Sequence, residues 1–111
     1  LRLVGRQRTL KLLLTGDALT AADALALGIV SEVVPDDQVD AAAIALASRI
    51  SAMPPLAVRQ IREVVNAGAD CSLDAALRLE HKSLQLLCAT EDKAEGIRAF
   101  FEKRPPVFSG R

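Results

Sequence analysis

Apolar residues recur along most of this chain at alternating steps of three and four, the spacing of one face of an α-helix. The clearest stripe runs through Val39, Ala43, Leu46, Ile50 and Met53. Similar stripes before and after it predict a mainly α fold of about six helices joined by short connections. No internal repeat and no interdomain linker is visible, so residues 1–111 are expected to form a single region.

Residues typical of helix ends divide the stripes into separate helices. The expected starts are a capping box of Thr20 and Asp23, a cap at Asp36 or Asp37, Pro55 as a first helical residue, and caps at Ser72 and Thr90. The expected ends are Gly16, Gly28, the neighbourhood of Gly68, and the residues before Pro105.

One segment departs from the helical pattern. Ile29–Val34 is rich in β-branched residues and is followed by Pro35, which predicts a short strand. A single strand cannot stand alone, so its partners would lie outside these residues, or the segment is an extended connector. Together with a first residue that is Leu1 and not Met, this suggests a truncated or processed chain.

Composition narrows the classes of function. Fourteen basic and fourteen acidic residues balance at a pI near 6.8, which argues against a partner that is a nucleic acid or an anionic membrane. Half of the residues are hydrophobic, which is high for a lone chain of this length, so part of the apolar surface is expected to meet a partner.

The cysteines and the apolar runs indicate in which cellular compartment the protein is expected. Cys71 and Cys88 are too few for a disulfide framework, and we expect two reduced thiols in a cytoplasmic protein. No signal peptide and no apolar run of the roughly 18 residues needed for a membrane span is evident in the sequence.

Candidates for catalysis or metal binding are weak. Glu80 and His81 could form a proton-transfer pair, but adjacent helical residues point about 100° apart, and we expect Glu80 to pair with Arg59 or Arg62 instead. Cys71, His81 and Cys88 lack the spacing and the fourth ligand of a zinc site, so no metal is expected. GxGxxG, P-loop and GxSxG motifs are absent from the sequence.

The stretch from Asn66 to Asp70 includes the tetrad AGAD, whose backbone N–H groups could serve an oxyanion. It follows the helical run Ile61–Val65 and precedes the cap Ser72, so an interhelical turn is the preferred interpretation.

All three aromatic residues, Phe100, Phe101 and Phe108, lie in the last twelve positions. The predicted final helix combines Ile97 and the first two rings with four cations: Lys93, Arg98, Lys103 and Arg104. Aromatic faces beside Lys and Arg suit a nucleotide, whose base stacks and whose phosphates need cations. Alternatively, the helix docks its phenylalanines on the body of the protein or on a neighbouring subunit.

Three blocks together resemble a known family. In order, they are LLLTGDALTAADALALGIVSEVV, PPLAVRQIREVV and ATEDKAEGIRAFFEKRPPVF. They are similar, with even spacing from Leu1 to Arg111, to the C-terminal part of the enoyl-CoA hydratase/isomerase (crotonase) superfamily. The resemblance implies that residues 1–111 are the C-terminal helical, oligomerising region of a crotonase-type fold, without the N-terminal core of β-β-α turns.

The resemblance also implies a function in acyl-CoA metabolism. The intact enzymes add water to 2-enoyl-CoA thioesters, which are substrates, so no cofactor is expected. The family's oxyanion hole and two catalytic glutamates belong to segments upstream of Leu1, and neither Ala67–Asp70 nor Glu80 matches them. No catalytic residue is therefore transferred, and the chain by itself is expected to be inactive.

One family feature does match. In related hydratases the Phe and Lys of the AFxEKR motif contact CoA across a subunit boundary, and the matching residues are Phe100 and Lys103. The expected partners are acyl-CoA in the intact enzyme, and copies of this chain or a chain carrying the core, in a trimer-based assembly. The alternative is an autonomous helical interaction module from a split or decayed gene that binds a partner chain.

Overall fold

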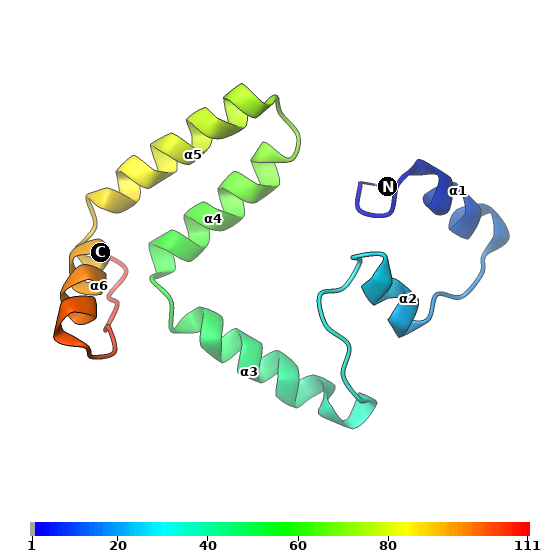
Figure 1. Ribbon diagram of the computed structural model, residues 1–111, viewed down its shortest axis with the longest axis horizontal. Coiled ribbons are helices and arrows are strands. Elements are labelled where there is room, and N and C mark those ends of the chain that lie inside the picture. The colour runs from blue at the N-terminus through cyan, green and yellow to red at the C-terminus, as the bar shows by residue number, and fades with distance from the viewer. Residues whose placement is uncertain (1) are drawn as a thin grey trace. The chain divides into compact units, whose positions relative to one another are not determined.

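The computed structural model describes residues 2–111, which divide into one unit ending at Ala43 and another running from Ile44 to Arg111. Six α-helices and one 3-10 turn make up the regular structure of the described residues (Figure 1). Their bounds are α1 Arg6–Thr15, α2 Ala21–Ala26, η1 Asp36–Gln38, α3 Val39–Ser51, α4 Pro55–Gly68, α5 Leu73–Cys88 and α6 Glu91–Glu102. The predicted mainly α class and its number of helices are confirmed.

In the first unit, two of the predicted helix ends are confirmed. α1 ends at Gly16, whose φ of 68° is left-handed and whose N–H donates to the carbonyl of Leu12. α2 begins after Thr20, whose hydroxyl accepts the Asp23 N–H at 3.1 Å and so caps the helix. The Asp23 carboxylate accepts from the Thr20 hydroxyl, whereas in a full capping box it would accept the Thr20 backbone N–H.

Two predictions for the segment after α2 are wrong. Residues 29–35 form no strand, and the described part of the chain offers no neighbouring strand to pair their N–H and C=O groups. The alternative, a connector, fits these residues. Neither Asp36 nor Asp37 caps α3, because both lie inside the 3-10 turn that leads directly into that helix.

In the second unit, α4 and α5 form a helical hairpin and pack side by side (Figure 1). Pro55 is the first residue of α4, and the Ser72 hydroxyl accepts the Ala75 N–H at 3.3 Å to cap α5, as predicted. At the closed end, a Cβ on Gly68 would lie 3.5 Å from that of Ala76. Small residues there let the two helices approach closely.

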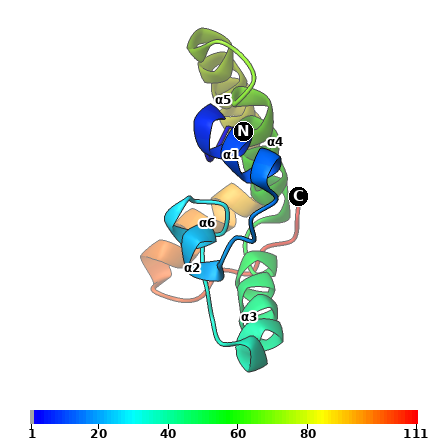
Figure 2. The same cartoon turned by 90° about the vertical axis from the view of Figure 1, so that its right-hand side faces the viewer.

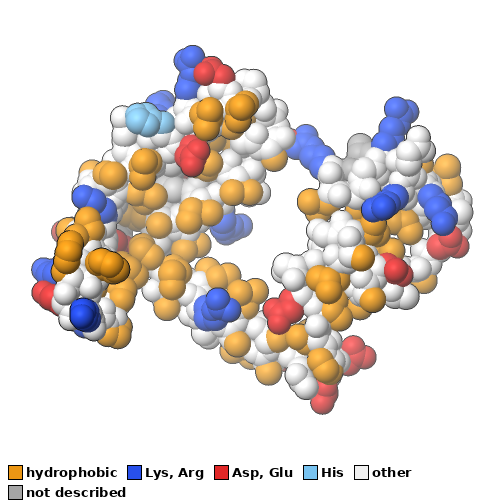
Figure 3. Space-filling model, viewed as in Figure 1, with side chains coloured by type: hydrophobic (Ala, Val, Ile, Leu, Met, Phe, Trp, Pro, Cys, Tyr) orange, Lys and Arg blue, Asp and Glu red, His pale blue; other side chains and the backbone are white. Residues whose placement is uncertain are grey.

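The second unit leaves much of its apolar surface uncovered. Ala99 is the only apolar side chain that is buried within residues 2–111. Ile61 and Val65 of α4 and Leu84 of α5 are each more than half exposed, and hydrophobic side chains gather over this hairpin in Figure 3. The expectation that apolar surface remains for a partner agrees with this exposure.

No single helix of the described chain is long and apolar enough to cross a membrane. Asp36–Ser51 and Pro55–Gly68 pass that test only as a pair, and a bend of 107° separates them.

Candidate functional site

The helix α6 and the tail after it carry most of the residues that the sequence singled out. α6 begins after Thr90, whose hydroxyl accepts the Lys93 N–H at 3.2 Å, so this predicted cap is confirmed. Glu91 and Asp92 lie in the first turn, where the helix dipole favours negative charge.

The aromatic residues of this region separate into two groups. Phe100 and Phe101 are 79% and 77% exposed, and their rings meet edge to face with centroids 5.8 Å apart. Neither ring docks on the described residues of the chain. Phe108 instead lines a groove and lies 3.7 Å from the position that a Cβ on Gly96 would occupy. The exposed pair is therefore the part available to a ligand or another subunit.

The four cations near these rings also separate. Arg98 and Arg104 each approach the carboxylate of Glu95 to 2.6 Å. Lys93 and Lys103 make no ion pair within residues 2–111. The lysines are consequently the cations of α6 that can meet an anionic ligand without giving up a partner.

Glu95 is a centre of hydrogen bonding. Its side chain accepts from both arginines and from the Val107 N–H at 3.0 Å, and the residue is only 9% exposed. Hydrogen bonds from Arg104, then from Val107 and Arg98, hold the pKa of Glu95 far below its ordinary value. The same contact, helped by Glu102, raises the pKa of Arg104. The carboxylate therefore stays ionised at physiological pH.

Asp92 holds the end of the chain. Its carboxylate accepts the backbone N–H of Ser109 at 2.7 Å and that of Gly110 at 2.9 Å, and its own N–H donates to the carbonyl of Arg111. The C-terminus accordingly lies beside the first turn of α6 in Figure 1. Figure 2 shows the tail passing from the end of α6 towards the start of α4.

A left-handed residue makes this reversal. Lys103 has a φ of 54°, and the N–H of Arg104 then donates to the carbonyl of Ala99 at 3.1 Å. This hydrogen bond, which spans five residues, is one of the two that define a Schellman-type helix end. Glycine is the usual residue at the left-handed position of that motif. The predicted stop before Pro105 is confirmed, but the left-handed conformation of Lys103 has no signal in the sequence.

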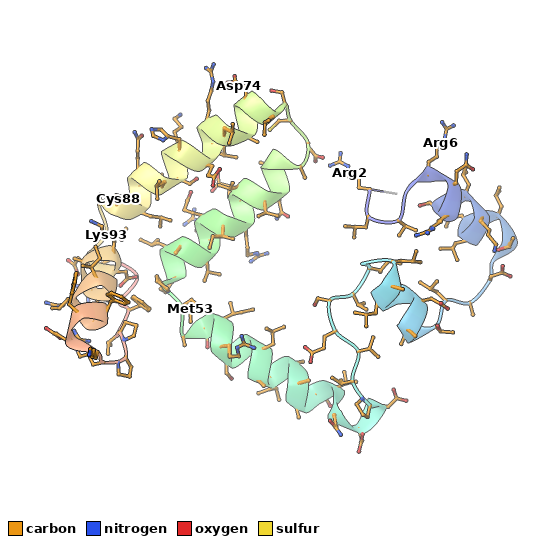
Figure 4. The ribbon with its side chains drawn as sticks, in the orientation of Figure 1. Arg2, Arg6, Met53, Asp74, Cys88 and Lys93 are labelled. Atoms are coloured by element: carbon orange, nitrogen blue, oxygen red, sulfur yellow. The ribbon has the colours of Figure 1, made fainter. Side chains whose placement is uncertain are left out.

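An apolar groove lies where α4, α5, α6 and the tail meet. Its volume is about 310 Å³, and the side chains at its wall include Leu56, Leu87, Cys88, Ile97 and Phe108. Cys88 ends α5 and Lys93 follows in the first turn of α6, as Figure 4 shows.

The other candidates are not brought together. His81 and Glu80 are both exposed, and the imidazole contacts Gln85 at 3.1 Å. The predicted ion pair of Glu80 with Arg59 or Arg62 is wrong, because the described residues form no such contact. Ala67 and Gly68 end α4, and the next two residues form the turn before α5, as predicted.

The cysteines and metal candidates form no centre. Cys71 and Cys88 are exposed free thiols. Within residues 2–111, no group of three or more His, Cys, Asp or Glu side chains is placed to bind a metal ion.

Sequence reasoning missed Asp92 and Glu95. Asp92 lies in the first turn of α6, where the helix dipole already explains an acidic residue, so its role in binding the tail was not expected. The backbone N–H groups that the two carboxylates accept belong to residues 12 to 18 positions later in the chain. A run of acids followed by a proline-containing tail is the only signal that could have suggested a tail folded back on the helix.

Comparison with known proteins gives consistent matches over the whole chain. The family model described as enoyl-CoA hydratase/isomerase matches residues 1–111. The 2,3-dehydroadipyl-CoA hydratase of Escherichia coli strain K12 is 39% identical over 111 residues, which are 100% of this chain and 44% of that protein.

Solved structures agree. An enoyl-CoA hydratase from Bacillus anthracis has a TM-score of 0.95 at 34% identity, and the match covers 99% of this chain and 43% of that one. A Geobacillus kaustophilus enoyl-CoA hydratase subunit gives 0.93 at 41% identity, with coverage of 99% and 43%. The chain thus spans less than half the length of these relatives. With a family model matched from its first residue to its last, it belongs to the enoyl-CoA hydratase/isomerase family, as the resemblance implied.

Proposed function

We propose that this chain is the C-terminal helical region of an enoyl-CoA hydratase/isomerase assembly, where it supplies subunit contacts and one edge of the CoA site. The observation that carries the proposal is the exposed aromatic pair of α6 beside a lysine that has no acidic partner among the described residues.

The edge consists of Phe100 and Lys103. Phe100 lies in the last turn of α6 and Lys103 directly follows its last residue, Glu102, so both belong to the same exposed end of the helix. CoA carries an adenine ring that can stack on an aromatic face and phosphates that an ammonium group can bind. Arg98 and Arg104 are already engaged by Glu95, which leaves the phosphate contact to Lys103.

The subunit contacts come from the apolar surface of the α4–α5 hairpin. Ile61, Val65 and Leu84 are exposed to an extent that a soluble surface rarely tolerates in one area. Interfaces bury such residues at their centre. The occupant is another part of the assembly, either a second copy of this chain or the core that the longer relatives possess.

We further propose that the 111 residues alone do not hydrate enoyl-CoA. The two buried carboxylates of α6, those of Asp92 and Glu95, bind the tail. The imidazole of His81 contacts Gln85 and not Glu80, and Glu80 pairs with no arginine of the described residues. The general acid and base of the reaction would come from the rest of the assembly.

A chimera tests both parts of the proposal. This chain would replace the 111 matching residues of the Escherichia coli relative, and the activity of the chimera on enoyl-CoA thioesters would be compared with that of the isolated chain. We expect a multimeric, active chimera by native mass spectrometry and enzyme assay, and no activity from the isolated chain. Hydratase activity of the isolated chain that is lost on mutating one of its own residues would refute the proposal.

Single substitutions in the chimera test the CoA edge. Removing a stacked aromatic weakens nucleobase binding by about 1–3 kcal/mol, so Phe100→Ala should raise KM about tenfold with kcat little changed. Lys103→Ala should act in the same direction. Phe101→Ala and Lys93→Ala are matched controls on the same helix. Equal effects of Phe101→Ala and Phe100→Ala would refute the assignment of the stacking ring. A stable isolated fold without any effect of these residues on CoA would instead support the interaction module.

A further inference from the structure

α6 is held to the second unit differently from α4 and α5, the two helices of the hairpin. Among the described helices, α4 and α5 are the pair that pack on each other extensively. α6 follows α5 after a two-residue connection and meets the hairpin around the apolar groove. Helix packing alone therefore leaves the far end of α6, with Phe100 and Lys103, without direct support.

The tail supplies that support because it touches both sides. Phe108 lines the groove and packs at Gly96 of α6. Two residues later, Gly110 lies against Pro55, the first residue of α4. A Cβ added to Gly110 would lie 3.6 Å from the Cγ of the Pro55 ring. Residues 105–111 thus bridge α6 and α4 (Figure 2).

Two carboxylates bind the tail at separate levels. Asp92 accepts the N–H groups of Ser109 and Gly110, and Glu95 accepts that of Val107. The two side chains are three residues apart and so occupy one side of the helix. Both residues are buried, at 3% and 9% exposure, and no other described acid accepts a hydrogen bond from the tail.

Glu95 also controls the reversal of the chain. It binds Arg104, the residue directly after the left-handed Lys103, through both terminal nitrogens of the guanidinium group. The same carboxylate therefore joins the residue after the turn to Val107 in the tail. Glu95 therefore holds the residue that directly follows Lys103.

We propose that Asp92 and Glu95 are positioning residues for the CoA edge: they clamp residues 105–111 onto α6 and α4, and so hold Phe100 and Lys103 in the geometry that receives CoA. The inference rests on the proposed function, because the edge is the site that the clamp positions. Neither carboxylate touches CoA in this scheme.

Isosteric amides test the clamp with least disturbance. In Asp92→Asn, one of the two acceptor oxygens becomes an NH₂ that faces the N–H of Ser109 or Gly110. In Glu95→Gln, the same change removes an acceptor from Arg104 or Val107. Glu91→Gln on the same helix and Glu63→Gln on α4 are the controls, since both acids are exposed and neither binds the tail or Arg104.

The first readout uses the 111-residue chain itself. Hydrogen exchange resolved by NMR should show the amides of Val107, Ser109 and Gly110 exchanging about tenfold faster in the variants, since a hydrogen bond to a charged group is typically worth a factor of this order. The controls should leave these rates unchanged. Unchanged rates in both Asp92→Asn and Glu95→Gln would overturn the clamp, and two variants are used because Asp92 also lies in the first turn of the helix.

The second readout separates positioning from general stability. In the chimera described above, each amide variant should raise KM for the thioester severalfold with kcat unchanged. Combined with Phe100→Ala and Lys103→Ala together, it should add little further increase, because it acts through the two residues already removed. A merely structural role would lower the amount of active enzyme and would combine additively with that double variant.

The two proposals fail in distinguishable ways. If Phe100→Ala raises KM but Asp92→Asn and Glu95→Gln do not, the positioning role is wrong and the CoA edge stands. If none of the three raises KM, the CoA edge itself is wrong, and the positioning role falls with it.

Discussion

A substitution of Lys103 by glycine should stabilise the end of α6. Lys103 has a φ of 54°, a left-handed conformation that costs a residue with a Cβ about 1–2 kcal/mol. Glycine adopts this conformation freely, but it gains about 0.4–1 kcal/mol of entropy in the unfolded chain. The difference predicts a net stabilisation of about 0.5–1 kcal/mol for Lys103→Gly.

The assay is hydrogen exchange at the Arg104 amide, which donates to the carbonyl of Ala99 across the turn. A stabilisation of this size should increase its protection about two- to fivefold. The local readout reports on the turn itself, whereas a melting curve averages over a chain in which Ala99 is the only apolar side chain buried among the described residues.

A matched control substitution should have the opposite effect on the stability of α6. Lys93 lies inside the first turn of the same helix, where glycine is destabilising by about 1 kcal/mol. Lys93→Gly should therefore decrease the protection of α6, although the two substitutions remove the same side chain. In the chimera, Lys103→Gly should raise KM for the thioester despite the more stable turn. Lower protection of Arg104 in Lys103→Gly would refute the argument, since the lysine side chain would then contribute more than its backbone conformation costs.

Two further predictions concern the clamp and the hairpin. The pKa of Glu95 lies far below its ordinary value near 4.5, so the stability that its ionised carboxylate contributes is fully present above pH 4.5 and is lost only as the pH falls through the lowered pKa. Protection of the Val107 amide, corrected for intrinsic exchange, should therefore be equal at pH 5 and pH 8. A loss of protection already at pH 5 would contradict the geometry at Glu95. Ile61→Lys should leave the helix content of the isolated chain unchanged by circular dichroism, because Ile61 is already 59% exposed. In native mass spectrometry the same substitution should disrupt assembly of the chimera, whereas Glu63→Lys on the same helix should not. An intact Ile61→Lys assembly would exclude this face from the interface.

The helix ends could be predicted from sequence because their causes are local. Thr20, Ser72 and Thr90 each cap a helix through an N–H three residues later, so the whole interaction is contained in a short stretch of sequence. The β-branched run from Ile29 to Val34 misled for the complementary reason. A strand depends on a neighbour to pair with, and β-propensity reports only a preference for such a surface.

Predicting the candidate site required both local sequence patterns and the path of the chain in space. The concentration of aromatics at the end of the chain pointed to the proposed site, and the family resemblance of the motif around Phe100 and Lys103 suggested its ligand. Which rings face outward could not be read from the pattern, because it depends on the path of the chain after Lys103.

Once that residue turns left-handed, the tail returns along α6, Phe108 enters the groove, and Asp92 and Glu95 receive its N–H groups. Phe100 and Phe101 remain outside as a consequence. The acids at the start of the helix and the rings at its end are therefore parts of one arrangement, although a helical periodicity assigns them to unrelated roles. If the proposed clamp holds, the substitutions that report on CoA binding therefore include those of two carboxylates whose own contacts are with the tail and with arginines.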